Sequence, residues 1–261
     1  MNGMLRICKE RSQNLKITSH PFFVVRSYNH HVYRMSRPEL IVFDLVGTTV
    51  NDNKNVYRVL YRLFKKIRIR ISLESVNNVI GIPKREAIKS LLQHYHYPYI
   101  SEMLVLEMYH HFVLKMKEFY LKNPSVREKD SISDLFKICK QYGIKVVVET
   151  EFDRSIAVSL LKRMGWDENA FIDAIITNDE AVKNRPQPDM IYRAMELTGI
   201  TDVEHVAKVG DTIFDLQEGT SAGCGWVIGV TSDVHTREQL KRGPHTHLID
   251  QLSELKPIFN L

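Results

Sequence analysis

Three acidic residues follow apolar runs of the chain, at spacings that allow them to act together. Asp44 comes directly after the run Leu40–Phe43, and Asp211 follows a second apolar run. Asp215 lies four residues beyond Asp211, about one helical turn. Buried parallel strands deliver such side chains to the carboxyl edge of a sheet, where ligands bind. Converging carboxylates repel one another unless a cation joins them, and an all-oxygen site with few protein ligands suits Mg²⁺.

Other polar side chains are expected at the same edge. Gly47 and Thr48 lie in the turn after the first strand, Thr150 follows the second strand, and Arg185 follows the third. Each threonine alone is typical of a turn, and Arg185 alone is typical of a surface loop. The joint pattern is much harder to obtain by chance. Arg185 carries a planar guanidinium fork suited to bidentate contacts, and Gly47 would permit close backbone approach.

The segments that must position these residues alternate between strand and helix. Strands are expected at 40–43, 144–148, 172–177, 206–209 and 226–230, and helices at 131–142, 155–164, 190–197 and after 214, with a last strand–helix unit. This alternation predicts an α/β fold with a doubly wound parallel sheet. Helical patterns also occupy the stretch after the first strand. We therefore expect a core of 37–53 and 129–261, interrupted by a helical cap at 54–128.

Composition narrows the function classes. The chain has 261 residues, 44% hydrophobic and 26% charged, with a net charge of +5 spread over several helices. We therefore expect no nucleic-acid partner, and no apolar run is long enough for a membrane span. Cys8, Cys139 and Cys224 lack paired or metal-like spacing, which favours reduced thiols. We expect solvent-facing or packed roles for the histidines of the insert, His94, His96, His110 and His111.

The first 36 residues differ from the rest. Met1–Ser36 contains six Lys or Arg residues and one acid, Glu10. Three interpretations stay open: an organelle transit peptide, a translation start at Met35, and a disordered tail. We expect a cytoplasmic protein, with organellar import left open, and we expect this leader to be dispensable for folding of the core.

From Leu40 onward the chain resembles the haloacid dehalogenase (HAD) superfamily of phosphohydrolases. The motifs "FDLVGTT", "ETEFDR", "RPQPDMIYRAM" and "VGDTIFD" are most similar to its phosphonatase branch. The resemblance implies a Rossmann-like core and a nucleophile, Asp44, that forms an aspartyl-phosphate. It implies Mg²⁺ held by Asp44, the carbonyl of Val46 and Asp211, with Asp215 in the outer shell. Thr48, Thr150 and Arg185 would bind the phosphoryl oxygens.

Val46 occupies the position where many such enzymes carry a second acid. That acid protonates the leaving group, and general acid/base help is worth roughly 10²–10⁴-fold. In the phosphonatase branch a lysine forms an imine instead, and Lys84 in "VIGIPKREAI" matches it. Lys84 could also bind charge on the substrate or lie on a helix surface. Two residues depart from that branch: Ala87 replaces a histidine, and Glu151 replaces a glycine. A carboxylate at position 151 would repel a bound phosphoryl group unless it points away.

The sequence thus predicts a phosphonatase-like hydrolase that acts on a small phosphorylated or phosphonate metabolite. Phosphonoacetaldehyde hydrolase activity through Lys84 is one alternative. A catalytically impaired relative that binds a phosphorylated ligand or a protein partner is another, and a homodimer is left open.

Overall fold

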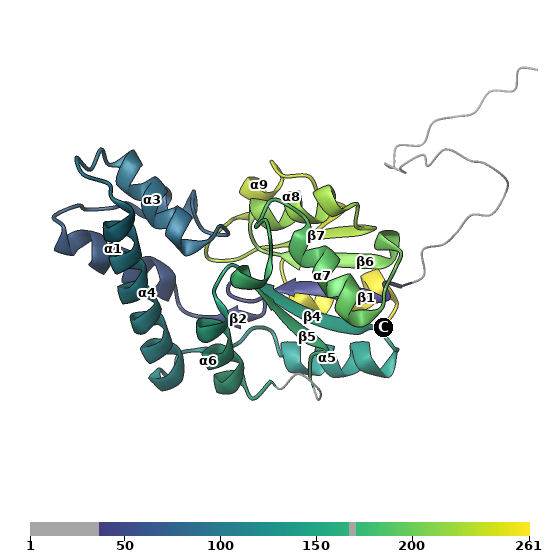
Figure 1. Ribbon diagram of the computed structural model, residues 1–261. Helices are drawn as coiled ribbons and strands as arrows, with labels where there is room; N and C mark the ends of the chain where they lie inside the picture. Colours follow the sequence, from purple (N-terminus) through teal and green to yellow (C-terminus); the bar gives the residue numbers. More distant parts are fainter. Residues whose placement is uncertain (1–36, 167–170) are drawn as a thin grey trace, which may run out of the picture. The chain divides into compact units, whose positions relative to one another are not determined.

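Six parallel strands form the central sheet, in the order β5-β4-β1-β6-β7-β8 (Figure 1). The computed structural model describes residues 37–166 and 171–261, so the expected leader lies outside the described residues. The strands are β1 (Leu40–Asp44), β4 (Lys145–Thr150), β5 (Ala174–Thr177), β6 (Val206–Gly210), β7 (Trp226–Val230) and β8 (His247–Ile249). The predicted doubly wound parallel sheet is confirmed.

Helices cover both faces of this sheet because its strands are apolar on both sides. Ile41 and Phe43 pack on the face covered by α5 (Ile132–Gln141) and α10 (Leu255–Phe259). Leu40 and Val42 pack on the other face, against α7 (Asp189–Thr198). On that same face, α8 (Ile213–Ala222) packs against β6 and β7. The remaining core helices are α6 (Arg154–Met164) and α9 (Arg237–Leu240), with 3₁₀ turns at Asn178–Glu180, Val203–His205 and Leu252–Glu254.

The predicted helical insert follows the first strand. It consists of α1 (Asn55–Lys66), α2 (Leu73–Asn77), α3 (Lys84–His94) and α4 (Glu102–Lys122). Its apolar side chains continue the core cluster, with Phe112 and Tyr120 of α4 packing on Phe152 at centroid distances of 6.1 and 6.2 Å. Its exact limits as a domain, 54–128, stay a prediction.

A short two-stranded ribbon, which the sequence did not predict, joins the two ends of the insert. β2 (Val50–Asn51) pairs antiparallel with β3 (Arg127–Glu128), and neither strand is among those predicted from the sequence. Backbone pairing forms this ribbon, and a pair of two-residue strands leaves no periodic side-chain pattern to detect.

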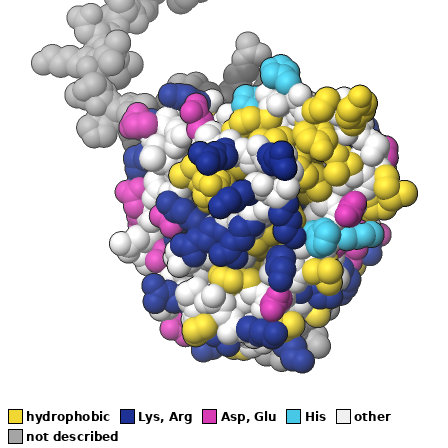
Figure 2. Space-filling view, turned by 90° about the vertical axis from the view of Figure 1, so that its left-hand side faces the viewer, with side chains coloured by type: hydrophobic (Ala, Val, Ile, Leu, Met, Phe, Trp, Pro, Cys, Tyr) yellow, Lys and Arg dark blue, Asp and Glu magenta, His cyan; other side chains and the backbone are white. Residues whose placement is uncertain are grey.

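One face of the insert is strongly basic. Figure 2 shows Lys and Arg side chains gathered there. A groove of about 440 Å³ runs between α1 and α4, and its charged lining comprises Arg62, Lys66, Lys115, Lys122 and the single acid Glu118. The histidines of the insert are solvent-facing, one of the two roles predicted for them. All four are exposed: His94, His96, His110 and His111. None of the described helices combines the length and apolar character that a bilayer crossing requires.

Candidate active site

The period-two geometry of the strands sends three charged side chains to one face of the sheet. Asp44 lies beside Glu149 in the register of β1 and β4, and Val42 lies beside Lys208 in β6. Since alternate residues of a strand face the same way, Asp44, Glu149 and Lys208 all point toward α7 and α8. The first turns of α8 bring Asp215 and Glu218 to the same place.

Arg185 lies at the centre of this acidic cluster. Its Nη1 is 2.8 Å from Asp44 Oδ1 and 3.1 Å from Asp215 Oδ1. Its Nη2 is 2.6 Å from Glu149 Oε1, and its Nε is 3.0 Å from Glu218 Oε2. The side chain is 1% exposed. The predicted phosphoryl-binding arginine therefore contacts the predicted nucleophile directly.

Lys208 is a second buried cation in the cluster. Its ammonium contacts Glu149 and lies 3.0 Å from Asp215 Oδ1 and 3.1 Å from Glu218 Oε2. Both side chains of the Lys208–Glu149 pair are fully buried. A buried charge is tolerated only when it is paired, so this lysine makes the acidic cluster compatible with the interior.

The pKa values of the acids diverge according to their neighbours. Burial, and then the charge of Asp215, raise the pKa of Asp44 well above its usual value. The same two causes, in the same order, raise the pKa of Asp211 to about 7. Burial also disfavours the Asp215 carboxylate, but the charges of Arg185 and Lys208 outweigh it and lower the pKa of Asp215 to about 2. A cation beside Asp44 and Asp211 would relieve their repulsion.

The predicted metal-binding acids meet at one point. One ligand oxygen from each of Asp44, Asp211 and Asp215 lies within 4.8 Å of the others. Asp211 Oδ1 accepts a hydrogen bond from Thr48 Oγ1 at 3.0 Å, while its buried Oδ2 has no hydrogen-bond partner. Gly47 has φ 104°, and a Cβ there would lie 2.3 Å from that oxygen. Only glycine allows the turn to pass this close to Asp211.

Thr150 and Val46 lie at the border of the cluster. Thr150 is fully buried, and its Oγ1 accepts a hydrogen bond from the backbone N–H of Phe152 at 3.2 Å. Its hydroxyl proton is therefore available to another acceptor. Val46 is half-buried and forms an isolated bridge with Val50. The two residues keep their predicted place at the sheet edge, and their roles stay predictions.

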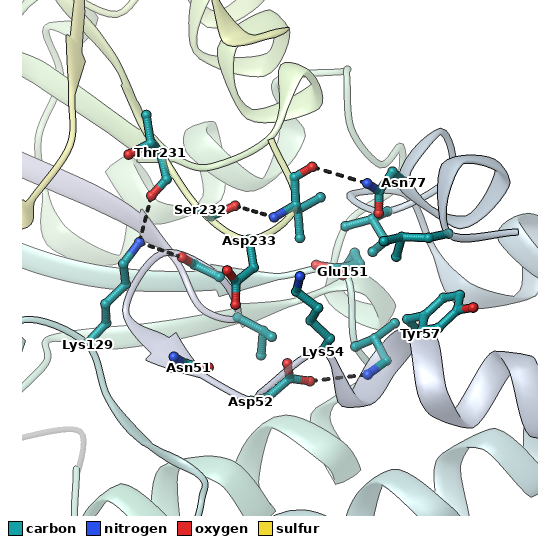
Figure 3. Close-up of a pocket in the computed structure, with 16 residues that line it drawn as sticks. Asn51, Asp52, Lys54, Tyr57, Asn77, Lys129, Glu151, Thr231, Ser232 and Asp233 are labelled. Carbon is teal, nitrogen blue, oxygen red and sulfur yellow. Dashed lines mark hydrogen bonds between the residues drawn. The ribbon is translucent and has the colours of Figure 1, made fainter. Parts of the chain in front are cut away.

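A cavity of about 290 Å³ opens beside these residues, between the sheet edge and the insert (Figure 3). Val46, Gly47 and Glu151 line it from the core side, and Lys54 and Tyr57 line it from the insert. Additional lining residues come from the loop after β7: Thr231, Ser232, Asp233 and Val234. The cavity is therefore lined by the loop of Val46 and Gly47, which follows the predicted nucleophile Asp44 in the chain.

Lys129 crosses the wall of this cavity. Its ammonium donates hydrogen bonds to the carbonyl oxygens of Gly47 at 3.1 Å and Thr231 at 2.9 Å (Figure 3). The residue follows β3 directly, so it connects the ribbon of the insert to two loops of the sheet edge. Its positive charge also favours the ionised form of Asp211 and so opposes the rise in that pKa.

Lys84 and Glu151, which the sequence pattern singled out separately, are partners. Lys84 Nζ lies 2.7 Å from Glu151 Oε1, and the side chains are 1% and 9% exposed. Glu151 Oε2 lies 3.8 Å from Arg185 Nη1. Burial disfavours the Glu151 carboxylate, but the charges of Lys84 and then Arg185 lower its pKa. The carboxylate thus points toward two cations, which offsets the repulsion expected near a bound phosphoryl group.

Sequence reasoning missed four charged residues of this region: Lys129, Glu149, Lys208 and Glu218. A detectable signal existed for two of them, because Glu149 and Lys208 interrupt otherwise apolar strands, and a strand buried on both faces excludes unpaired charges. Glu218 lies on α8 among residues of mixed polarity, and Lys129 belongs to a charged run, so neither stands out.

A family model for haloacid dehalogenase-like hydrolases matches residues 41–229. The chain belongs to this family. Among curated proteins, the chain is similar to phosphonoacetaldehyde hydrolase of Bacillus cereus (strain B4264), with 28% identity over 209 residues that cover 74% of this chain and 75% of the relative.

Solved structures show the same fold. A phosphonoacetaldehyde hydrolase-like protein from Oleispira antarctica superposes with a TM-score of 0.77 at 19% identity, covering 90% of this chain and 96% of that one. CbbY from Rhodobacter sphaeroides, solved in complex with phosphate, gives a TM-score of 0.72 at 18% identity, covering 84% and 96%. The expected resemblance to the phosphonatase-like branch is confirmed, and the chain is a hydrolase of the haloacid dehalogenase type.

We predict that Lys208→Met destabilises the fold by about 3–5 kcal/mol, because it leaves buried carboxylates without one of their two cations. Urea denaturation measures the free energy of unfolding. The control is Lys145→Met, which removes a half-exposed lysine 3.3 Å from Asp173 and should cost at most about 1 kcal/mol. Equal losses in the free energy of unfolding for the two variants would show that the buried network stabilises the fold no more than a surface ion pair does.

Proposed function

We propose that this protein is a Mg²⁺-dependent phosphohydrolase that forms an aspartyl-phosphate on Asp44. Its substrate would be a small phosphorylated or phosphonate metabolite that enters the 290 Å³ cavity. The observation that carries the proposal is the 2.8 Å contact between Arg185 Nη1 and Asp44 Oδ1. A guanidinium beside a carboxylate nucleophile can bind the phosphoryl oxygens and orient the attacking atom together.

The residues present fit a magnesium ion. Asp44 and Asp211 would hold it, with the carbonyl oxygen of Val46 as a third protein ligand and Asp215 in the outer shell. The buried, unpartnered Oδ2 of Asp211 supports this assignment, since buried carboxylate oxygens rarely lack a partner. When bound, the ion would neutralise charge on the phosphoryl group.

Residues of the chain itself would carry out nucleophilic attack and bind the phosphoryl group. In this proposal Asp44 attacks phosphorus while Arg185 and the hydroxyl of Thr150 bind the equatorial oxygens. The hydroxyl of Thr48, which donates to Asp211 Oδ1 in this structure, would turn toward them when substrate binds. Gly47 lets the backbone pass close to the group. Water would then release phosphate from Asp44 and regenerate the carboxylate.

The first prediction tests the nucleophile. Asp44→Asn should abolish turnover of phosphorylated substrates, because an amide does not form the acyl-phosphate bond, while its melting temperature stays close to that of the wild type. Asp134→Asn changes an exposed aspartate, 69% accessible, and should keep full activity. Turnover that survives in Asp44→Asn, or in excess chelator, contradicts the mechanism. A wild type that binds phosphate compounds and hydrolyses none would instead favour the impaired, ligand-binding alternative.

A pH dependence of metal binding follows from the raised pKa values. Asp211, with a pKa of about 7, and Asp44 are protonated at low pH and must release protons to bind a metal. Mg²⁺ affinity should therefore fall as the pH decreases below about 7, with proton release on binding. Calorimetric titration at pH 6 and pH 8, in buffers of different ionisation enthalpy, measures both quantities. Equal affinities at the two pH values contradict this expectation.

Phosphonoacetaldehyde hydrolysis through a Lys84 imine is the second candidate. The B. cereus relative bears that activity in its name, and Lys84 reaches the site through Glu151. An ammonium group held 2.7 Å from a carboxylate lacks the free lone pair that imine formation needs. The missing histidine at Ala87 also counts against this candidate.

We therefore expect that an aldehyde-bearing phosphonate with borohydride leaves Lys84 unmodified in the wild type. Peptide mass spectrometry locates any reduced adduct, and Lys54, which lines the cavity, serves as the internal comparison. Specific labelling of Lys84 that disappears in Lys84→Ala would establish the imine mechanism instead.

A further inference from the structure

The acid that position 46 lacks has a counterpart across the cavity. Val46 and Glu151 line the same 290 Å³ space, Val46 from the loop after β1 and Glu151 from the end of β4. Glu151 is also tied to the nucleophile, because Asp44 Oδ1 and Glu151 Oε2 approach the same guanidinium nitrogen of Arg185, at 2.8 and 3.8 Å. A carboxyl group therefore lies near the guanidinium that contacts the nucleophile, although position 46 carries none.

Lys84 lies behind this carboxyl group. Its ammonium is 2.7 Å from Glu151 Oε1 and 3.1 Å from the carbonyl oxygen of Ile82, and it lies 5.3 Å from the ring centre of Phe152. Lys84 is not among the residues that line the cavity, whereas Glu151 is. Of the two side chains, Glu151 is therefore the one that can pass a proton from Lys84 to the cavity.

The backbone holds the lysine in this place. Gly81, three residues before it, has φ 98°, and a Cβ there would lie 2.8 Å from Thr212 Oγ1 and 2.9 Å from Phe214. The turn that precedes α3 therefore packs closely against the start of α8 in the core. The contact fixes Lys84 of the insert against Glu151 of the core.

We propose that Lys84 and Glu151 form a proton relay that replaces the acid missing at position 46, and that the substrates are phosphate monoesters of aliphatic alcohols. This inference rests on the proposed function. Such esters leave as poor alkoxides that need a proton, in contrast to acyl phosphates, whose leaving groups are stable without one.

Protons and electrons balance over the two half-reactions. In the first, Asp44 bonds to phosphorus, the bond between phosphorus and the ester oxygen breaks, and its electron pair stays on the alcohol oxygen. That oxygen takes a proton from Glu151, which takes one from the Lys84 ammonium. In the second, water attacks phosphorus, the bond to Asp44 breaks, and the proton of water returns through Glu151 to Lys84. The products are the alcohol and phosphate.

The test compares leaving groups. Turnover is measured with glycerol phosphate, p-nitrophenyl phosphate and acetyl phosphate, whose leaving groups differ widely in acidity. Glu151→Gln and Lys84→Met should each lower the turnover of glycerol phosphate by about 10²–10⁴-fold and change the turnover of acetyl phosphate little. Glu151→Gln combined with Val46→Asp should recover glycerol phosphate turnover, because it restores an acid to the other wall of the cavity.

A matched control separates this role from loss of an ion pair. Glu102→Gln removes an equally short pair, Lys89 Nζ to Glu102 Oε1 at 2.7 Å, from the exposed surface of the insert, and should change no rate. Melting temperatures confirm that each variant is folded. Equal loss on all three substrates, or no recovery with Val46→Asp, overturns the relay and leaves the Asp44 mechanism standing. Absence of all three activities in the wild type overturns the proposed function itself.

Discussion

The guanidinium of Arg185 permits the acidic residues of this protein to share one edge of the sheet. Five carboxylates lie within 4 Å of it, those of Asp44, Glu149, Glu151, Asp215 and Glu218. With like charges this close, neighbouring carboxylates would otherwise take up protons. Lys208 assists from the strand, and Lys84 assists from the insert.

Charge balance in this cluster is incomplete without a further cation. Six acids, the five above and Asp211, face three buried bases, Arg185, Lys208 and Lys84. The pKa of Glu218 is raised well above its usual value by burial and then by the charge of Glu149, so burial and this neighbour disfavour its ionised form. Asp44 and Asp211, whose pKa values are also raised, lie where further positive charge is lacking. A divalent cation between these two residues would complete the balance and bring anionic substrates to the same point.

The sequence was sufficient to predict the fold and to identify several of the residues that the structure brings together at the sheet edge. Apolar strands followed by polar residues identify the sheet edge, because buried strands have few other places for a carboxylate. Contacts between distant segments could not be obtained in this way. Glu151 looked like a repulsive departure until its distance to Lys84, 67 residues earlier in the chain, was known. Strand limits also shifted: the expected strand 172–177 begins at Ala174, and the expected strand 144–148 extends to Thr150. Hydrogen bonds to neighbouring strands set these ends, and they are not encoded in local hydrophobicity.

The ribbon formed by β2 and β3 has a mechanical consequence for the insert. Both connections to the core pass through one antiparallel pair, so any swing of the insert against the core would pivot at this ribbon. Lys129 anchors one strand of the pair to the carbonyl oxygens of Gly47 and Thr231. The pivot therefore lies beside the turn that contains Gly47. Displacement grows with distance from a pivot. A swing would therefore move the far tip of the insert most and separate Lys84 from Glu151, while the geometry around Gly47 would change least.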